Sequence, residues 1–178
     1  IDRFLEEYPE YKEKFIFFQL GQMSRIHIPR YKQLNDEINA LVEEINWKHS
    51  QGTWSPIFLT RSYMKYQDIL ALYSMADTCL VGSLHDGMNL VAKEFAASRY
   101  DLDGVLILSQ FTGAARELTD ALSVNPYDTE SYADTIHQAL EMPREEREKR
   151  MRKMRETVFQ NNVYRWAGKV LSQLLQFE

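Results

Sequence analysis

Hydrophobic positions along the chain follow two spacings, which predict alternating strands and helices. Short apolar runs predict strands at 15–20, 56–60, 78–81, 105–108 and 122–124. Between these runs, apolar residues recur at intervals of three and four, as they do on the buried face of a helix. The run at 15–20 is nearly continuous, which suits a sheet covered on both faces. This alternation predicts the α/β class, with a parallel sheet between helices.

The helical spacing also places individual residues. The long helix that begins at Pro29 carries one apolar stripe that includes Leu34, Leu41 and Ile45. Tyr73 mostly faces the core from the helix that follows Tyr66.

Two further helix starts are predicted toward the C-terminus. Gly113 opens a helix in which Ala114 and Ala115 are expected to pack against the sheet and not to contact a ligand. Asp128 or Thr129 caps the helix that follows the turn at 125–128.

The two ends of the chain differ from this middle part. Ile1, Phe4 and Leu5 have helical spacing with no capping residue before them, so we expect a fragment that begins inside a helix. From Pro143 onward the sequence is helical and carries charges of both signs, which is typical of a solvated face with i,i+4 pairs. We therefore predict an α/β lobe over 1–142, truncated at its N-terminus, and C-terminal helices over 143–178.

One stretch in the middle combines a strand end, a glycine loop and a helix start. The loop Gly82–Gly87 follows the strand at 78–81 and leads into a helix predicted to begin near Met88. Open α/β sheets hold ligands at this edge, because the helix presents unpaired amides and the positive end of its dipole. Gly87 would let an anion approach the backbone closely. The spacing alone fits an ordinary strand–turn–helix junction equally well.

Two carboxylates flank this helix start. Asp86 lies on the loop, and Glu94 lies about two turns into the helix, so the pair can bracket the two ends of one elongated ligand. Taken singly, each is more simply a capping or surface acid. The interpretation of the pair as a binding site depends on the residues around them.

Those residues resemble a known family. The segment from Asp86 to Glu94 has the sequence DGMNLVAKE. It resembles the donor-sugar loop of the trehalose-6-phosphate synthase family. Members of this family are family 20 glycosyltransferases of the two-lobed GT-B fold. The resemblance continues through Trp54–Pro56, Gly104–Ala115 and Val124–Tyr127. It implies the C-terminal, nucleotide-sugar-binding lobe, a Rossmann-like parallel sheet flanked by helices. In this fold the last helix, here 163–177, packs back toward the N-terminal lobe.

The resemblance also implies roles for individual residues. Asp86 is the catalytic candidate and would orient the donor sugar through hydrogen bonds to its hydroxyls, and Glu94 would accept those of the ribose. Arg25 would contact the acceptor phosphate. The remaining donor-binding candidates are Gly87, Met88, Asn89, Leu90 and Val91 for the distal phosphate and sugar, and Leu20, Tyr63 and Ile69 for the base.

The implied reaction is transfer of glucose from UDP-glucose to glucose 6-phosphate with retention, giving trehalose 6-phosphate and UDP. It requires no metal and no cofactor, and the leaving diphosphate itself would deprotonate the acceptor. The family's Arg and Lys that clamp this diphosphate lie in a segment upstream, which this sequence lacks. We therefore expect the chain alone to be inactive and to bind UDP weakly.

Two alternatives remain open. The family commonly has Arg immediately before the Asp-Gly-Met-Asn-Leu motif, and this chain has His85. His85 is either a neutral loop residue or the mark of another acceptor, as in a sister transferase such as glucosylglycerol-phosphate synthase. The second alternative is a non-catalytic lobe that binds a nucleotide for regulation or assembly.

Composition excludes several other classes. The net charge of −5 argues against a nucleic-acid-binding face, and no apolar run approaches the roughly 20 residues that span a bilayer. A hydrophobic fraction of 44% in 178 residues is sufficient for one core. The single cysteine, Cys79, lies in a strand-like run and is interpreted as a core residue, with no disulfide or metal site. We expect a cytoplasmic protein without nucleic-acid or membrane partners.

Overall fold

The predicted alternation of strands and helices is confirmed in the computed structural model, which describes residues 1–21 and 27–177. Every strand pairing between named strands is parallel, so the α/β class with parallel sheets flanked by helices is confirmed. The strands form two sheets, ordered β1-β2 and β3-β4-β5, and the chain divides into two compact units, Ile1–Lys65 and Tyr66–Glu178. We describe each unit by itself.

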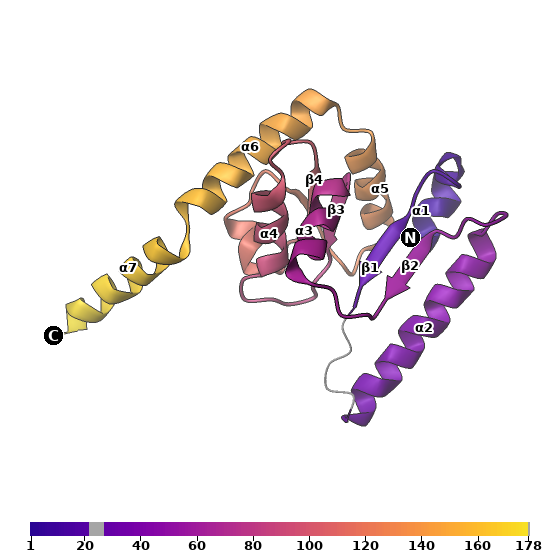
Figure 1. Cartoon of the computed structure of the whole chain (residues 1–178), viewed down its shortest axis with the longest axis horizontal. Helices are drawn as coiled ribbons and strands as arrows, with labels where there is room; N and C mark the ends of the chain where they lie inside the picture. Colours follow the sequence, from indigo (N-terminus) through magenta and orange to yellow (C-terminus); the bar gives the residue numbers. More distant parts are fainter. Residues whose placement is uncertain (22–26, 178) are drawn as a thin grey trace. The chain divides into compact units, whose positions relative to one another are not determined.

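The first unit is a two-stranded parallel sheet with a long helix beside it (Figure 1). The amide side chain of Asn46 joins the helix to the sheet, since it donates to the carbonyl of Ile57 and accepts from its N–H, both at 2.9 Å. The elements are α1 (Asp2–Glu7), η1 (Pro9–Tyr11), β1 (Phe17–Leu20), α2 (Pro29–His49) and β2 (Ile57–Thr60).

Helix α2 is only partly covered within this unit. Its apolar stripe was predicted to include Leu34 and Leu41, and these side chains are 50% and 55% exposed, whereas Ile45 is buried. The C-terminal end of α2 is tied to α1, because the carboxylate of Asp2 accepts from Lys48 and lies 2.6 Å from Nε2 of His49. The packed part of the unit is therefore the end where α1, α2 and β2 meet.

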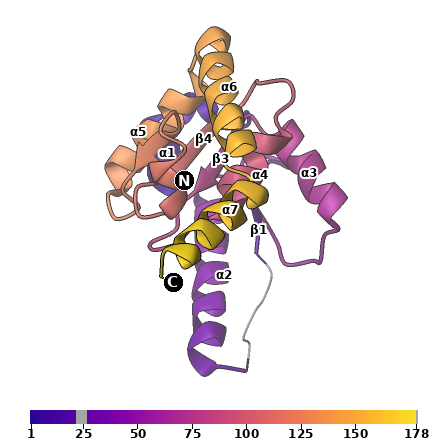
Figure 2. The same ribbon diagram turned by 90° about the vertical axis from the view of Figure 1, so that its left-hand side faces the viewer.

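The second unit is a three-stranded parallel sheet with helices on both faces. Helices α4 and α5 lie on opposite sides of β3 and β4 in two views (Figures 1 and 2). All five residues of β4 are buried, as expected for the middle strand of a covered sheet. The elements are α3 (Tyr66–Met75), β3 (Thr78–Val81), α4 (Leu90–Ser98), β4 (Val105–Ser109), η2 (Gly113–Arg116), β5 (Leu122–Val124), α5 (Thr129–Leu140), α6 (Arg144–Gln160), α7 (Val163–Leu174) and η3 (Leu175–Phe177).

Helix α6 belongs to the core of this unit despite its charged sequence. Met151 and Met154 are almost fully buried and pack in one cluster with Phe95 of α4. Burying a side chain of this size contributes roughly 1.5–3 kcal/mol. The other face carries the predicted i,i+4 ion pairs, Arg144 with Glu148 and Arg150 with Glu146. The domain boundary at 142/143 stays a prediction, and α6 packs on α4 on the C-terminal side of it.

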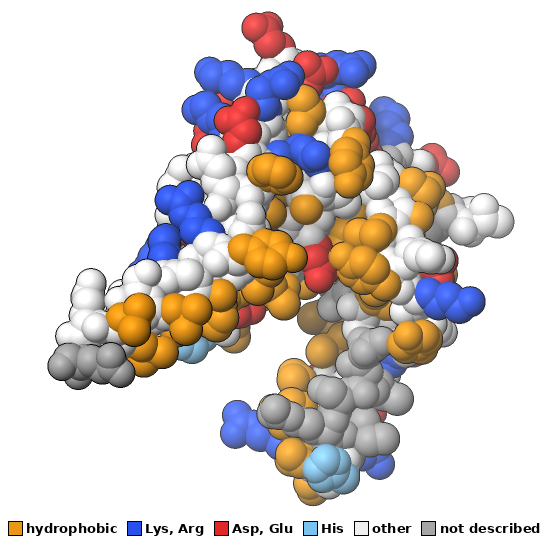
Figure 3. All heavy atoms as spheres, turned by 60° about the vertical axis from the view of Figure 1, so that its left-hand side comes forward, with side chains coloured by type: hydrophobic (Ala, Val, Ile, Leu, Met, Phe, Trp, Pro, Cys, Tyr) orange, Lys and Arg blue, Asp and Glu red, His pale blue; other side chains and the backbone are white. Residues whose placement is uncertain are grey.

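The last helix, α7, has an exposed apolar face. Hydrophobic side chains gather along it (Figure 3), and the exposed residues include Val163, Tyr164, Trp166, Leu171 and Leu174. This agrees with the sequence pattern, which predicts an amphipathic helix with apolar surface left uncovered in this chain. That the face packs on another lobe stays a prediction.

One predicted helix is much shorter than expected. The helix predicted to open at Gly113 is a single 3₁₀ turn, η2, that ends at Arg116. Two of its amides are used outside the turn, since Gly113 donates to the carbonyl of Asp86 and Ala114 donates to that of Met88. The residues between this turn and Leu122, where strand β5 begins, form no further helix.

Candidate functional site

The loop after β3 enters helix α4 through Asn89. Helix α4 begins at Leu90, two residues later than predicted, and Asn89 is its N-cap. The backbone of Asn89 has φ of 75°, a left-handed conformation that Asn tolerates better than most residues. Its side-chain oxygen accepts the N–H of Ala92 at 2.9 Å. The geometry of the cap therefore turns the loop into the helix.

The carboxylate of Asp86 is held by its own loop. It accepts the N–H of Met88 and the side-chain amide of Asn89, each at 3.0 Å. The Met88 hydrogen bond is the largest influence on this carboxyl, and together with the Asn89 side-chain bond it lowers the pKa of Asp86 below its usual value. An ionised carboxylate accepts hydrogen bonds and has no proton to donate, and its remaining lone pairs can accept sugar hydroxyls.

A neighbouring loop supports this one from the other side. The N–H of Asp86 donates to Phe111, and the N–H groups of Gly113 and Ala114 donate to Asp86 and Met88. A Cβ on Gly113 would overlap the carbonyl of Gly87, so the close approach of the two backbones requires glycine there. Ala114 is fully buried in the core, which agrees with the expectation of packing over ligand contact.

The opposite side of the loop is open. A Cβ on Gly87 would meet no atom within 4 Å, and the side chains of Met88, Leu90 and Val91 are exposed. The amides of Leu90 and Val91 belong to the first turn of α4 and have no acceptor within the helix. The site thus offers unpaired N–H groups and the positive end of a helix dipole at an open surface, which suits an anion.

The second predicted carboxylate, Glu94, lies half-buried on α4. The hydroxyl of Tyr73 on α3 donates to its Oε2 at 3.5 Å. The adjacent cation, Lys93, is engaged by Glu117 at 2.9 and 3.0 Å. In the described part of the chain no ion pair involves Glu94, so its carboxylate can accept from a ligand.

Gly82, at the start of the loop, is fixed by a tyrosine. A Cβ at this position would overlap the hydroxyl of Tyr132 on α5. Burial raises the pKa of Tyr132 to about 12, so the phenol is neutral at physiological pH. A larger residue at position 82 would therefore displace this phenol.

The other predicted site residues are placed as follows. Leu20 ends β1 and Tyr63, 80% exposed, follows β2, both in the first unit, whereas Ile69 is half-buried on α3 in the second unit. Their joint contact with a base stays a prediction. Arg25 lies outside the described residues, and so does the predicted contact with an acceptor phosphate.

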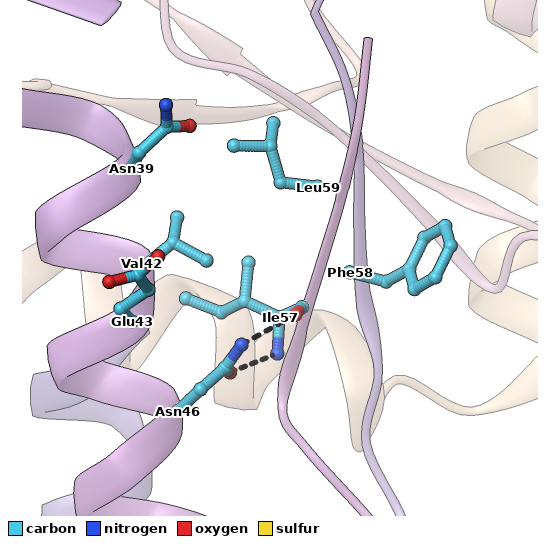
Figure 4. A pocket seen from close by; sticks show the side chains of 7 residues that line it. All are labelled: Asn39, Val42, Glu43, Asn46, Ile57, Phe58 and Leu59. Carbon is cyan, nitrogen blue, oxygen red and sulfur yellow. Dashed lines mark hydrogen bonds between the residues drawn. The ribbon is translucent and has the colours of Figure 1, made fainter. Parts of the chain in front are cut away.

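A hollow of about 300 Å³ lies in the first unit between α2 and β2 (Figure 4). Asn39, Val42 and Glu43 line its helix side. The side-chain amide of Asn46 also lines the hollow, and it already donates to the carbonyl of Ile57 and accepts from the N–H of Ile57. The loop after β3 instead offers amides and carboxylates at an open helix start, so we favour that loop as the site.

Other kinds of site find little support. Over 1–21 and 27–177, no group of three or more His, Cys, Asp and Glu side chains is placed to hold a metal ion. Burial raises the pKa of the Cys79 thiol to about 12, so it is not a thiolate nucleophile. None of the helices that the structure describes is long and apolar enough to span a membrane.

Sequence reasoning missed several residues that shape the site. Tyr73 was read only as a core residue of α3, because its contact with Glu94 joins two helices and leaves no local pattern. Arg99 was not singled out, although it is 3% exposed and binds the end of α3. The cap at Asn89 could have been found, since Asn directly before an apolar helical run is a typical N-cap.

The parallel α/β unit with a polar loop at the carboxyl end of a strand is the arrangement of nucleotide-binding proteins of this class. Comparison with protein families assigns the chain more narrowly: glycosyltransferase family 20 matches residues 1–176. The chain belongs to glycosyltransferase family 20.

The chain is similar to curated relatives in sequence and to solved structures in fold. It is 38% identical over 174 residues to a bifunctional trehalose-6-phosphate synthase/phosphatase of Thermoproteus tenax, covering 98% of this chain and 24% of that protein. An E. coli structure bound with UDP-2-fluoro glucose has a TM-score of 0.94 at 35% identity, covering 97% of this chain and 39% of that one.

A third match is the UDP-forming α,α-trehalose-phosphate synthase of Burkholderia xenovorans in complex with glucose-6-phosphate. Its TM-score is 0.94 at 35% identity, with 98% of this chain and 38% of that one covered. The chain therefore spans from 24% to 39% of the length of these three relatives.

Proposed function

We propose that this chain is the donor-binding lobe of a retaining glycosyltransferase that transfers glucose from UDP-glucose to glucose 6-phosphate, forming trehalose 6-phosphate. The observation that carries the proposal is the ordered Asp86 and Asn89 loop at the open N-terminus of α4, with Glu94 further along the same helix. The relatives support the substrates, because one structure is bound with UDP-2-fluoro glucose and another with glucose-6-phosphate.

The proposed placement of the donor follows from the charges at the site. The amides of Leu90 and Val91 face open space and suit the phosphate nearest the sugar. Glu94 lies four residues beyond Leu90, a rise of about 6 Å along the helix. A ligand that reaches both must be elongated, as a nucleoside diphosphate sugar is, with Glu94 accepting the ribose hydroxyls and Asp86 those of the sugar.

The remaining roles extend beyond this loop. Leu20, Tyr63 and Ile69 are proposed to contact the base, and Arg25 the acceptor phosphate. We also propose that the enzyme works in the cytoplasm, as expected of a protein that uses a nucleotide sugar and a sugar phosphate.

The proposed mechanism gives this lobe a positioning and electrostatic task. Asp86 is ionised, so it orients the sugar and does not protonate the leaving group. The leaving diphosphate would deprotonate the acceptor on the same face, and the amides at the start of α4 would stabilise the charge that develops on it. Asp86 and Glu94 both repel the diphosphate, so tight binding needs cationic groups from elsewhere in the enzyme. We expect this chain alone to bind UDP weakly and to transfer no glucose.

Nucleotide titration of two charge-matched variants tests the proposal. UDP and UDP-glucose are titrated into the chain and into Glu94→Ala and Glu148→Ala, the second being a surface acid of α6 that pairs with Arg144. Loss of the hydrogen bonds to a charged group should weaken binding about 10- to 100-fold in Glu94→Ala. The Glu148→Ala variant should bind like the unmodified chain. Equal affinities in all three proteins, or no binding by the unmodified chain at millimolar nucleotide, would refute the placement of the donor on this loop.

A further inference from the structure

The hydroxyl of Tyr73 contacts Glu94 from a different helix. Tyr73 lies near the C-terminal end of α3, and its oxygen is 3.5 Å from Oε2 of Glu94. The tyrosine ring meets the buried ring of Phe95 edge-on, with centroids 6.1 Å apart and planes at 84°. An edge-to-face pair of this kind adds to the energy of burial and fixes the ring plane.

A buried arginine holds the backbone that carries this tyrosine. Arg99 is 3% exposed, and its Nη1 donates to the carbonyls of Tyr73, Ser74 and Ala76 at 2.9, 2.9 and 2.6 Å. These carbonyls lie at the end of α3, where the helix leaves them without intrahelical partners. Because Arg99 itself follows α4 directly, its guanidinium fixes the end of α3 to the end of α4. The Tyr73 side chain therefore has little freedom relative to Glu94.

In this contact the Tyr73 hydroxyl is the donor and the Glu94 carboxylate is the acceptor. Burial, followed by the negative charge of Glu94, raises the pKa of Tyr73 well above its ordinary value, so the phenol stays protonated and acts as the donor. A carboxylate has about four lone-pair positions on two oxygens, and a donor on Oε2 leaves Oε1 free. Lys93 does not compete for this carboxylate, because it is engaged by Glu117.

We propose that Tyr73 is a positioning residue for the ribose: its hydroxyl holds the Glu94 carboxylate in the orientation that accepts the two vicinal ribose hydroxyls of a nucleoside diphosphate. The inference rests on the proposed function, which assigns the ribose to Glu94. It deepens that function, because it makes selectivity for ribose over 2′-deoxyribose depend on a residue of a different helix.

The test compares UDP with 2′-deoxy-UDP. Dissociation constants for both are measured by ligand-observed NMR with the unmodified chain, Tyr73→Phe and, as a control, Tyr100→Phe, whose ring is exposed and stacks on Arg155. Tyr73→Phe keeps the ring and removes one hydrogen bond, so it should weaken UDP binding about 3- to 10-fold. Binding of 2′-deoxy-UDP should change less than twofold, and Tyr100→Phe should change neither.

A double variant separates positioning from packing. Tyr73→Phe added to Glu94→Ala should cost no further affinity for UDP, because the carboxylate that the hydroxyl positions is gone.

The outcomes distinguish this inference from the proposed function. If the unmodified chain binds neither nucleotide, the proposed function fails and the inference fails with it. If it binds UDP and prefers it to 2′-deoxy-UDP while Tyr73→Phe keeps the full preference, the inference alone is overturned. An equal loss for both nucleotides in Tyr73→Phe would make Tyr73 a packing residue and would also overturn it.

Discussion

The second unit contains two strand-to-helix junctions at the same edge of one parallel sheet. They share this topology and differ in how their polar groups are exposed and hydrogen-bonded. The junction after β3, residues 82–89, is open on one side and carries a carboxylate and an amide that bind each other. The junction after β4, residues 110–112, closes into a single 3₁₀ turn, with Thr112 buried. The first exposes polar groups, and the second buries them.

The difference shows that one junction supports the other. Three backbone hydrogen bonds run between them, one of which joins the N–H of Ala114 to the carbonyl of Met88 at 2.7 Å. The N–H groups of Gly113 and Ala114, which could have bound a ligand after β4, donate instead to carbonyls of the loop after β3. A strand end at the ligand-binding edge of an α/β sheet is therefore not enough to make a site; its amides and carboxylates must also be unengaged.

The largest expected effect comes from the glycines where the junctions meet. Gly113→Ala places a Cβ against the carbonyl of Gly87, so one loop must shift, and we expect a loss of about 2–3 kcal/mol of unfolding free energy. UDP affinity should fall more than tenfold, because Asp86 and Met88 move with the loop. Chemical denaturation and nucleotide titration measure the two quantities.

Gly87→Ala is the matched variant on the open side. Its Cβ meets no atom within 4 Å and its φ is not left-handed, so the unfolding free energy should change by less than about 1 kcal/mol. UDP-glucose binding should still weaken, because the new methyl group occupies the space proposed for the donor. Equal stability losses in the two alanine variants would contradict the contrast between a supporting and an open junction.

The capping residue gives the next effect. Asn89→Ala removes the cap of α4 and puts alanine at a φ of 75°, which together should cost about 2–3 kcal/mol. Asp128→Ala, the same change at the N-cap of α5, should cost only about 1 kcal/mol, since Asp128 has an ordinary extended backbone. Thermal or denaturant unfolding compares them, and Asn89→Gly should recover the part due to φ. A larger loss in Asp128→Ala would overturn the analysis of this cap.

The smallest effect concerns pH. The folded pKa of Asp86 lies below the ordinary 3.8, so ionised Asp86 stabilises the fold above pH 3.8, and this contribution is lost as the pH falls through the lower, folded pKa. In unfolding experiments the advantage of the unmodified chain over Asp86→Asn should be constant near neutrality and shrink only below pH 3.8. The residue is only half-buried on a surface loop, so solvent screens its interactions and the advantage should be slight. An advantage that disappears near neutral pH would show that another group is responsible.

Much of the fold could be predicted from the sequence because its signals are local. Apolar runs located the five strands of the described part of the chain to within a few residues, and Asp128 caps α5 where the turn chemistry predicted. The Asp86 loop was found in the same way, as a glycine turn between a strand and a helix. Its family membership followed from the motif at that turn.

The rest depends on contacts between distant segments. The helix predicted at Gly113 ends after one 3₁₀ turn, and its first amides bind a loop that lies far away in sequence. No periodicity of the sequence indicates either feature. The contact of Tyr73 with Glu94 and the hold of Arg99 on α3 likewise join separate helices. Sequence pattern identified the carboxylates, and the structure shows what holds them.

The most direct test of the account is to map UDP-glucose on the chain by backbone amide NMR. We predict that the largest shift changes occur at the amides of 87–91, with smaller ones at 110–113, which bind that loop from behind. Residues 39–46 of the groove in the first unit should not change. Changes concentrated in that groove, or unchanged amides at 87–91 under saturating UDP-glucose, would contradict the central claim that the junction after β3 binds the donor.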